Sequence, residues 1–116
     1  MKRFACFLLM LVLLTGISGC NIEYKGPFSQ VLYLDGHGGT FSMNIPVEKQ
    51  EIILSFLNEG QWEEGGINCG HDYEFITEKE TIRYSSDSGT FIDITHKRYM
   101  SLYKTKKEQV NNILGA

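Results

Sequence analysis

Residues 72–104 contain four runs typical of β-strands, separated by breaks of three polar residues. The runs are Asp72 to Thr77, Thr81 to Ser85, Gly89 to Thr95 and Tyr99 to Lys104. Breaks this short suit hairpin turns, and two strands joined by a hairpin turn run antiparallel. The pattern therefore restricts this part of the chain to an antiparallel meander.

An earlier pair of runs, Gln30 to Leu34 and Thr40 to Ile45, flanks the Gly-rich segment Asp35-Gly36-His37-Gly38-Gly39. Apolar and polar residues alternate in the second run, which predicts a half-buried strand. The short Gly-rich link predicts a hairpin. A glycine loop that binds phosphate would instead lead from a strand into a helix. We therefore interpret His37 as a solvated loop residue.

Two helices are also predicted. Pro46 suits the first turn of a helix, and an apolar stripe with helical spacing follows within residues 47–58. A second helix is predicted near the C-terminus. Thr105-Lys106-Lys107-Glu108 matches the capping box that begins a helix, and Gly115 is typical of the residue that ends one. The order of elements predicts an α+β fold, an antiparallel sheet of about five or six strands with one amphipathic helix packed on it and a short C-terminal helix.

The first 20 residues differ in kind from the rest. Lys2 and Arg3 give a basic start, and an apolar stretch of 14 residues runs from Phe4 to Ile17. Spanning a bilayer takes about 20 apolar residues, so a transmembrane helix is not favoured. A basic start, a short apolar stretch and small residues before a cleavage point are the parts of a secretory signal.

The tetrapeptide Ile17-Ser18-Gly19-Cys20 resembles the lipobox of bacterial lipoproteins, which has an aliphatic residue and two small residues before a Cys. The resemblance implies cleavage between Gly19 and Cys20, a diacylglyceryl group on the Cys20 thiol and further acylation, for example with palmitate, of the new amino terminus. Two or three acyl chains hold a small domain stably at a membrane. The alternative is an ordinary signal in which Cys20 is incidental.

This interpretation predicts three segments: a signal peptide at residues 1–19, a lipidated tether at 20–28 and a single α+β domain at 29–116. The tether contains Gly-Pro and shows no sustained period, which is typical of a linker. The expected location is the outer membrane of a two-membrane bacterium, because Asn rather than Asp follows Cys20. In other bacteria it is the outer face of the cytoplasmic membrane. We expect no cofactor apart from the covalent lipid on Cys20.

The net charge and the cysteines of the chain limit the classes of molecule that it could bind. Without Lys2 and Arg3, nine basic residues remain against 14 acidic ones, a net charge of about −5. That balance argues against nucleic-acid binding, which needs a basic surface. With Cys6 removed in the signal and Cys20 lipidated, Cys69 is the single thiol, which leaves it buried, reactive or paired between molecules. No Cys pair has the spacing of a metal site.

Two motifs would support a hydrolase. Asp87-Ser88-Gly89-Thr90 matches the Asp-Ser/Thr-Gly-Ser/Thr signature of aspartic proteases, in which two aspartates share a proton, here in a dimer. The same residues suit a tight hairpin, which we favour because polar residues precede Asp87. Cys69 and His71, followed by Asp72, have the spacing of a nucleophile and base on one face of an extended segment. A buried thiol beside an edge histidine is the favoured alternative.

Aromatic residues in the predicted strands suit either a core, which we favour, or a binding surface. Tyrosine combines apolar area with a polar tip, which suits contacts with other molecules, although such residues also fill ordinary cores. Tyr99 and Tyr103 are the expected exposed pair, and Glu63 and Glu64 belong to the acidic part of the same predicted binding surface.

Several features of residues 57–114 resemble small uncharacterised bacterial lipoproteins and secreted domains. They are Leu57-Asn58 with Trp62, Asn68-Cys69 with Asp72-Tyr73, the segment Tyr84 to Phe91, and a closing helix. The resemblance implies a second Cys near Ser88 bonded to Cys69, but this chain has serine there. The expected function is a membrane-anchored, non-enzymatic module that binds an envelope or extracellular protein. A small hydrolase using Asp87, or Cys69 with His71, is the alternative.

Overall fold

The computed structural model describes residues 22–67 and 69–116. The predicted signal peptide, the cleavage site at Gly19 and the lipidated Cys20 lie outside these residues. The elements in chain order are β1 (Gln30–Leu34), β2 (Thr40–Ser42), α1 (Val47–Glu59), β3 (Glu63–Glu64), β4 (Tyr73–Ile76), β5 (Thr81–Ser85), β6 (Thr90–Asp93), β7 (Arg98–Ser101) and α2 (Lys104–Leu114). The predicted α+β class is confirmed, with seven strands where about five or six were expected.

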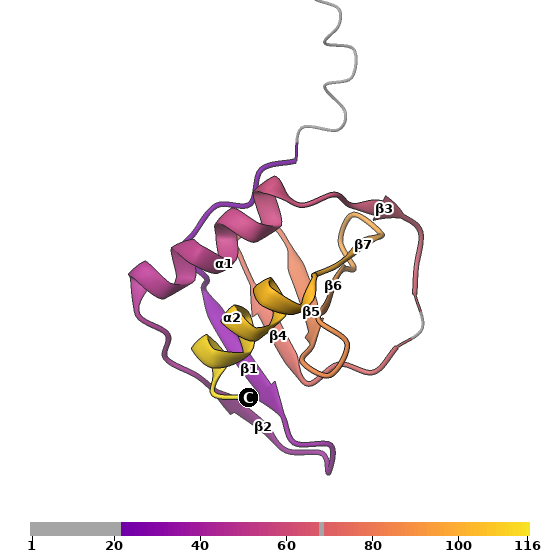
Figure 1. Cartoon of the computed structure of the whole chain (residues 1–116). Helices are drawn as coiled ribbons and strands as arrows, with labels where there is room; N and C mark the ends of the chain where they lie inside the picture. Colours follow the sequence, from indigo (N-terminus) through magenta and orange to yellow (C-terminus); the bar gives the residue numbers. More distant parts are fainter. Residues whose placement is uncertain (1–21, 68) are drawn as a thin grey trace, which may run out of the picture.

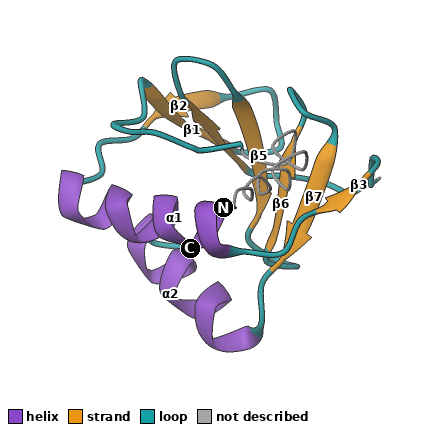
Figure 2. Cartoon of the chain, turned by 90° about the horizontal axis from the view of Figure 1, so that it is seen from above, coloured by secondary structure: helices purple, strands orange, loops and turns teal. Residues whose placement is uncertain are grey.

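The strands form one antiparallel sheet in the order β2-β1-β4-β5-β6-β7-β3. Strands β4 to β7 follow one another in space as they do in the chain, which confirms the meander. Both helices cover the same face of the sheet, and no helix of the described residues lies on the opposite face (Figures 1 and 2). The fold is therefore a two-layer arrangement in which the helices bury one side of the sheet.

The hydrophobic core lies between the sheet and the helices. Tyr73, Tyr84, Phe91 and Met100 are neighbours across β4 to β7, and all four side chains are buried. Because paired residues of antiparallel strands share a face, this row forms a continuous floor for the helices. The helices contribute their fully or largely buried residues to the core: Ile53, Leu54, Phe56, Leu57, Val110 and Leu114.

Both helices occur where they were predicted, but the capping box does not. Helix α2 begins at Lys104 with Tyr103 as its N-cap, and no side chain caps it. Thr105 already lies within the helix, so its hydroxyl is not placed to cap the free backbone donors of the first turn. Gly115 ends the helix as expected, in the left-handed conformation with φ 79°.

One strand was missed. The sequence patterns predict no strand at residues 61–66, yet Glu63 and Glu64 pair with Tyr99 and Arg98 and make β3, an edge of the sheet. Two glutamates have no strand-like pattern of their own, and the pairing depends on α1 directing the chain past β7.

The tether prediction needs correction. Tyr24 is 2% exposed and Phe28 is 7% exposed, and both belong to the hydrophobic core. The Asn58 side chain accepts a hydrogen bond from the Tyr24 backbone N–H and donates one to its carbonyl. Aromatic burial and these two hydrogen bonds dock residues 24–28 on α1, so the folded domain begins before residue 29.

Within the described residues, neither helix combines the length and the apolar character that crossing a membrane would require.

Candidate functional site

A buried carboxylate, Asp93, organises one end of the sheet. Its side chain is 0% exposed at the end of β6. The Oδ1 atom accepts hydrogen bonds from the backbone N–H groups of Thr95 and His96, each 3.0 Å long. The Oδ2 atom accepts the Tyr24 hydroxyl at 2.5 Å and His96 Nδ1 at 2.8 Å. A carboxylate has about four acceptor positions, so all of those on Asp93 are filled.

Arg98 stands next to this carboxylate because β6 and β7 pair Asp93 with Arg98. Arg98 Nε and Nη2 donate to the Tyr24 hydroxyl oxygen at 3.1 and 2.6 Å. Arg98 Nε is 4.0 Å from Asp93 Oδ2. The guanidinium carbon also lies 4.5 Å from the centre of the Trp62 ring, within the range of a cation–π interaction. These contacts hold the guanidinium in one position.

The Tyr24 phenol links the two charged groups. Burial raises the pKa of Tyr24 far above its ordinary value, and the neighbouring Asp93 carboxylate raises it further. The phenol therefore stays protonated at neutral pH, so it donates to Asp93 and accepts from Arg98. We call Tyr24, Asp93, His96 and Arg98 the Asp93 cluster.

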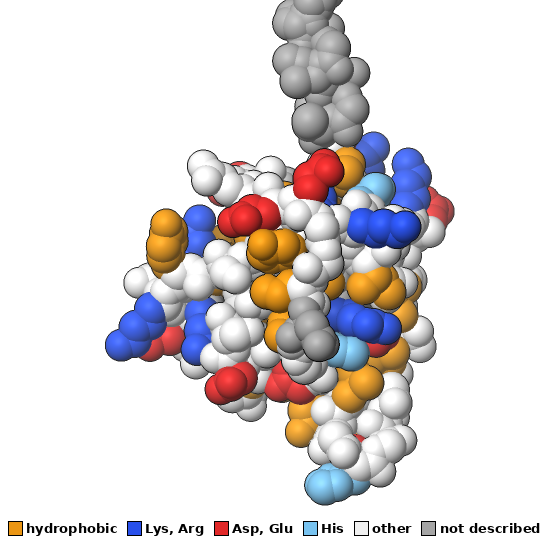
Figure 3. All heavy atoms as spheres, turned by 90° about the vertical axis from the view of Figure 1, so that its right-hand side faces the viewer, with side chains coloured by type: hydrophobic (Ala, Val, Ile, Leu, Met, Phe, Trp, Pro, Cys, Tyr) orange, Lys and Arg blue, Asp and Glu red, His pale blue; other side chains and the backbone are white. Residues whose placement is uncertain are grey.

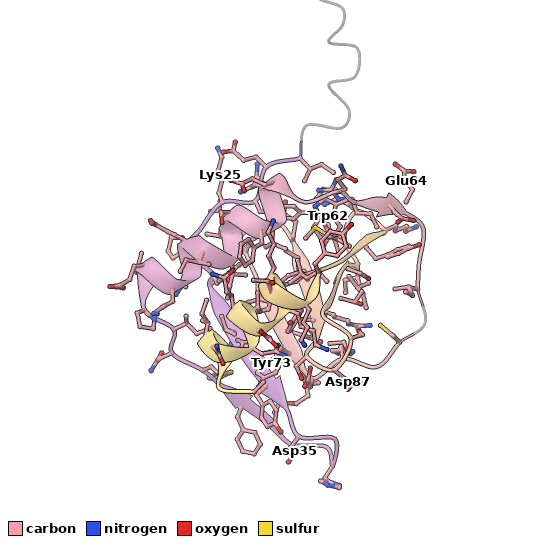
Figure 4. All side chains as sticks on the ribbon, viewed as in Figure 1. Lys25, Asp35, Trp62, Glu64, Tyr73 and Asp87 are labelled. Carbon is pink, nitrogen blue, oxygen red and sulfur yellow. The ribbon has the colours of Figure 1, made fainter. Side chains whose placement is uncertain are left out.

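A cavity of about 380 Å³ lies beside the Asp93 cluster, and we call it the Trp62 groove. Trp62 lies two positions after Gly60, the residue that caps the C-terminus of α1. Its indole Nε1 donates a hydrogen bond to the Leu57 carbonyl at 2.8 Å. In Figure 4, Trp62 points inward beside β7, and Glu64 lies at the outer edge of the sheet. The lining residues are Ile22, Leu57, Asn58, Gly60, Trp62, Glu63, Glu64, His96 and Arg98.

The two glutamates of β3 have different surroundings. Glu64 is paired with Arg98, so both side chains emerge on the same side of the strand ladder. Glu63 is paired with Tyr99, and the Tyr99 hydroxyl donates to Glu63 Oε1 at 3.2 Å. This hydrogen bond to a carboxylate raises the pKa of Tyr99.

The predicted binding surface of Tyr99, Tyr103, Glu63 and Glu64 is thus brought together only in part. Tyr99 and Glu63 contact each other on the face opposite the helices. Glu64 lies with Arg98 on the other side. Tyr103 is 88% exposed, as expected, but it lies beyond β7 at the N-terminus of α2 and is not part of the sheet.

The second predicted site, at Cys69, lies in the loop between β3 and β4. Cys69 and His71 line a cavity of about 420 Å³ together with Arg83, Ile92 and other residues. Figure 3 shows this side of the molecule, where hydrophobic side chains surround the loop and Lys and Arg side chains flank it.

The His71 ring is held by Glu74, whereas the neighbouring Asp72 has other partners. His71 Nε2 lies 3.3 Å from Glu74 Oε2, and Arg83 Nε lies 3.6 Å from the same oxygen. Asp72 instead accepts hydrogen bonds from the backbone and side chain of Ser86. Within the part of the chain that the structure describes, no hydrogen bond joins Cys69 to His71, and no group of three or more His, Cys, Asp or Glu residues could hold a metal ion.

Asp87 lies in the tight turn between β5 and β6, as the hairpin interpretation predicted. Its side chain is exposed, and its carbonyl accepts a hydrogen bond from Lys107 Nζ at 2.6 Å. Gly89 takes a φ of 72° there, which glycine adopts readily. The turn lies at the opposite end of the sheet from Trp62 and Glu64 (Figure 4).

Sequence reasoning missed Tyr24, Asp93 and Arg98 as parts of one site. One local signal was present: Asp93 follows Phe91 by two positions, so the strand period places this aspartate on the core-facing side. A carboxylate in that position needs buried partners. No local pattern indicates that one partner is Tyr24, because that residue is far away in the chain.

Comparison of this chain with protein-family models, curated proteins and solved structures finds no match.

Proposed function

We propose that this chain is a membrane-anchored bacterial lipoprotein whose domain is a small non-enzymatic binding module, with the Trp62 groove as its ligand site. The anchor is inferred from the Ile17-Ser18-Gly19-Cys20 pattern. The membrane is the outer one in a two-membrane bacterium, or otherwise the cytoplasmic membrane at its outer face.

The observation that carries the binding role is the fixed position of Arg98 at the groove. Tyr24 and Trp62 hold the guanidinium from two directions, and the described hydrogen bonds use only Nε and Nη2. A donor that is already oriented loses little conformational entropy when a ligand binds, which favours affinity. The groove is also within the size range of small-molecule sites, about 300–1,000 Å³.

The location of the groove supports the same proposal. Ile22 lines it, and Ile22 is only two positions after Cys20 in the chain. Two extended residues span at most about 7 Å, so an acylated Cys20 would keep the groove close to the membrane surface. Tethering raises the effective concentration of any ligand in that membrane, so a weak site is sufficient.

Metabolic labelling tests the anchor. With radiolabelled palmitate, the wild-type chain should be labelled and sediment with membranes, and Cys20→Ala should lose both properties. Cys69→Ala is the matched control, because it removes a thiol outside the lipobox and should be labelled normally. An unlabelled wild-type chain would refute the anchor.

Site-specific photocrosslinking in cells tests the binding role. A photoreactive residue at position 64 lies on the rim of the groove, whereas position 108 is an exposed site on α2. We expect a discrete adduct from position 64 and none from position 108. The same adducts from both positions, or none from either, would contradict a ligand site in the groove.

A second candidate function, a thiol hydrolase, rests on one observation. Cys69 and His71 line the same cavity, and Glu74 holds the His71 ring. A nucleophile, a base and a group that orients the base are the components of covalent catalysis. Activity that disappears in Cys69→Ala would favour this candidate over the binding module.

A further inference from the structure

We propose that the Trp62 groove binds a phosphoethanolamine group, in the form of a lipid headgroup: a phosphate next to a primary ammonium. This inference rests on the proposed function, because it takes the groove as the ligand site and the membrane as its neighbour. Charged side chains of both signs line the groove, among them Arg98 and Glu64.

The phosphate would bind Arg98. The guanidinium has five N–H groups. The hydrogen bonds of the described residues use Nε–H and one N–H of Nη2, both directed to Tyr24. The remaining N–H groups on Nη1 and Nη2 form the fork that binds phosphate oxygens in pairs. Because Asp93 has its acceptor positions filled by other donors, its carboxylate does not occupy this fork.

The ammonium would bind His96 and Glu64. Since a carboxylate only accepts hydrogen bonds, His96 Nδ1 carries the hydrogen that lies between it and Asp93 Oδ2. In the neutral imidazole, Nε2 is then an acceptor, and His96 lines the groove. Glu64 adds a carboxylate on the same side of the strand ladder as Arg98. Among the described residues, no cation lies within 4.0 Å of the Glu64 carboxylate.

The groove thus offers a fixed cation at one point and acceptors for a cation at another. An inorganic anion would satisfy only Arg98, and a simple amine would satisfy only the acceptors. A phosphoethanolamine group satisfies both. The same group exists free and in phospholipids, and the position of Ile22 beside Cys20 favours the phospholipid.

Titration of the full chain in detergent micelles tests the chemistry. Trp62 is the only tryptophan, so its fluorescence reports on the groove. The probes are phosphoethanolamine, inorganic phosphate and ethanolamine. We expect phosphoethanolamine to bind at least about tenfold more tightly than either of the others, a difference of about 1.4 kcal/mol. Equal binding of phosphoethanolamine and phosphate would overturn the proposal.

Variants assign the roles. Glu64→Gln should reduce the affinity for phosphoethanolamine several-fold and leave the affinity for phosphate unchanged. Glu108→Gln, an exposed carboxylate on α2, is the matched control and should change neither affinity. Arg98→Lys should weaken binding of phosphate and of phosphoethanolamine. Because Arg98 also supports the fold, the exposed Glu64 is the deciding position, and unchanged affinities in Glu64→Gln would refute the proposal.

Vesicles distinguish the source of the ligand. In vesicles of phosphatidylglycerol with phosphatidylethanolamine, the reconstituted chain should show the Trp62 change seen with phosphoethanolamine. In vesicles of phosphatidylglycerol with phosphatidylcholine it should not, because the choline nitrogen has no N–H to donate. A response to free phosphoethanolamine but to neither vesicle would exclude the lipid headgroup.

These results separate the inference from the proposed function. A labelled Cys20 and a position 64 adduct, together with no binding of phosphoethanolamine, would refute only the inference. An unlabelled Cys20 would refute the anchor, and the micelle titration would still report on the groove.

Discussion

The Tyr24 hydroxyl donates a 2.5 Å hydrogen bond to the Asp93 carboxylate, although the two residues are 69 positions apart in the chain. Arg98 completes the contact by donating to the Tyr24 hydroxyl oxygen. This relationship joins the N-terminal segment to the turn between β6 and β7, and it places the Asp93 cluster beside the Trp62 groove.

Tyr24→Phe should lower the free energy of unfolding by about 1–3 kcal/mol, because it removes the hydroxyl and leaves a buried carboxylate short of one partner. Chemical denaturation measures this change. Tyr103→Phe is the matched control. The Tyr103 side chain is 88% exposed, so its loss of a hydroxyl should change stability by less than about 0.5 kcal/mol. Equal effects of the two substitutions would contradict the role of the Tyr24 hydroxyl.

Stability should fall in alkali. Burial raises the pKa of both Tyr24 and Tyr84, while a tyrosine in the unfolded chain titrates near pH 10. Below about pH 10 the phenols are protonated in both states, so the full stability is present. Above that pH these two phenols ionise only in the unfolded chain, and each of them removes up to about 1.4 kcal/mol per pH unit until its folded-state pKa is reached.

Two measurements check the alkaline prediction. The denaturation midpoint should be constant up to about pH 10 and then decline. Ultraviolet titration of the folded chain should show fewer ionised phenols near that pH than the six tyrosines in the sequence. A folded chain in which all six titrate together at the ordinary value would disprove the burial of Tyr24 and Tyr84.

Gly60→Ala should destabilise the chain by about 1–3 kcal/mol, the usual effect of overpacking a core. A Cβ atom at Gly60 would overlap Met100 Sδ, and Met100 is buried. Gly66→Ala is the control, since nothing lies within 4 Å of a Cβ atom there. Thermal unfolding of the two variants should therefore differ, and similar melting temperatures would argue against tight packing below the Trp62 groove.

Asp87→Asn should leave both stability and biological activity unchanged. The carboxylate is exposed, and the turn is held through the Asp87 carbonyl and through Gly89. A surface substitution of this kind changes stability by less than about 0.5 kcal/mol. The measurement is chemical denaturation together with a phenotype assay in cells. A large loss of activity with unchanged stability would revive the aspartic protease hypothesis.

Several elements could be predicted because their signals are local. The meander from β4 to β7 follows from strand-like runs separated by short polar breaks, and α1 follows from one apolar stripe after Pro46. The turn at Asp87 follows from residues that favour tight hairpins. Each of these signals lies within a few neighbouring positions, so the relevant residues are visible together in the sequence.

The parts that could not be predicted depend on distant contacts. Strand β3 exists because β7 is beside it, since a pair of glutamates has no strand preference of its own. The segment at Tyr24 looks like a linker, but it is ordered because α1 and Arg98 supply partners. Among the proposed binding residues, Glu63 and Tyr99 meet, whereas Tyr103 is carried away at the start of α2.

The amino-acid sequence by itself determined the α+β class, most of the element order and the lipobox-like pattern at Cys20, because these depend on composition, period and short motifs. The tertiary structure alone decided that Tyr24, His96 and Arg98 gather around the buried Asp93 carboxylate beside Trp62. A buried carboxylate and guanidinium are stable only where every polar atom finds a partner, and those partners come from segments that only the folded sheet and helices bring together.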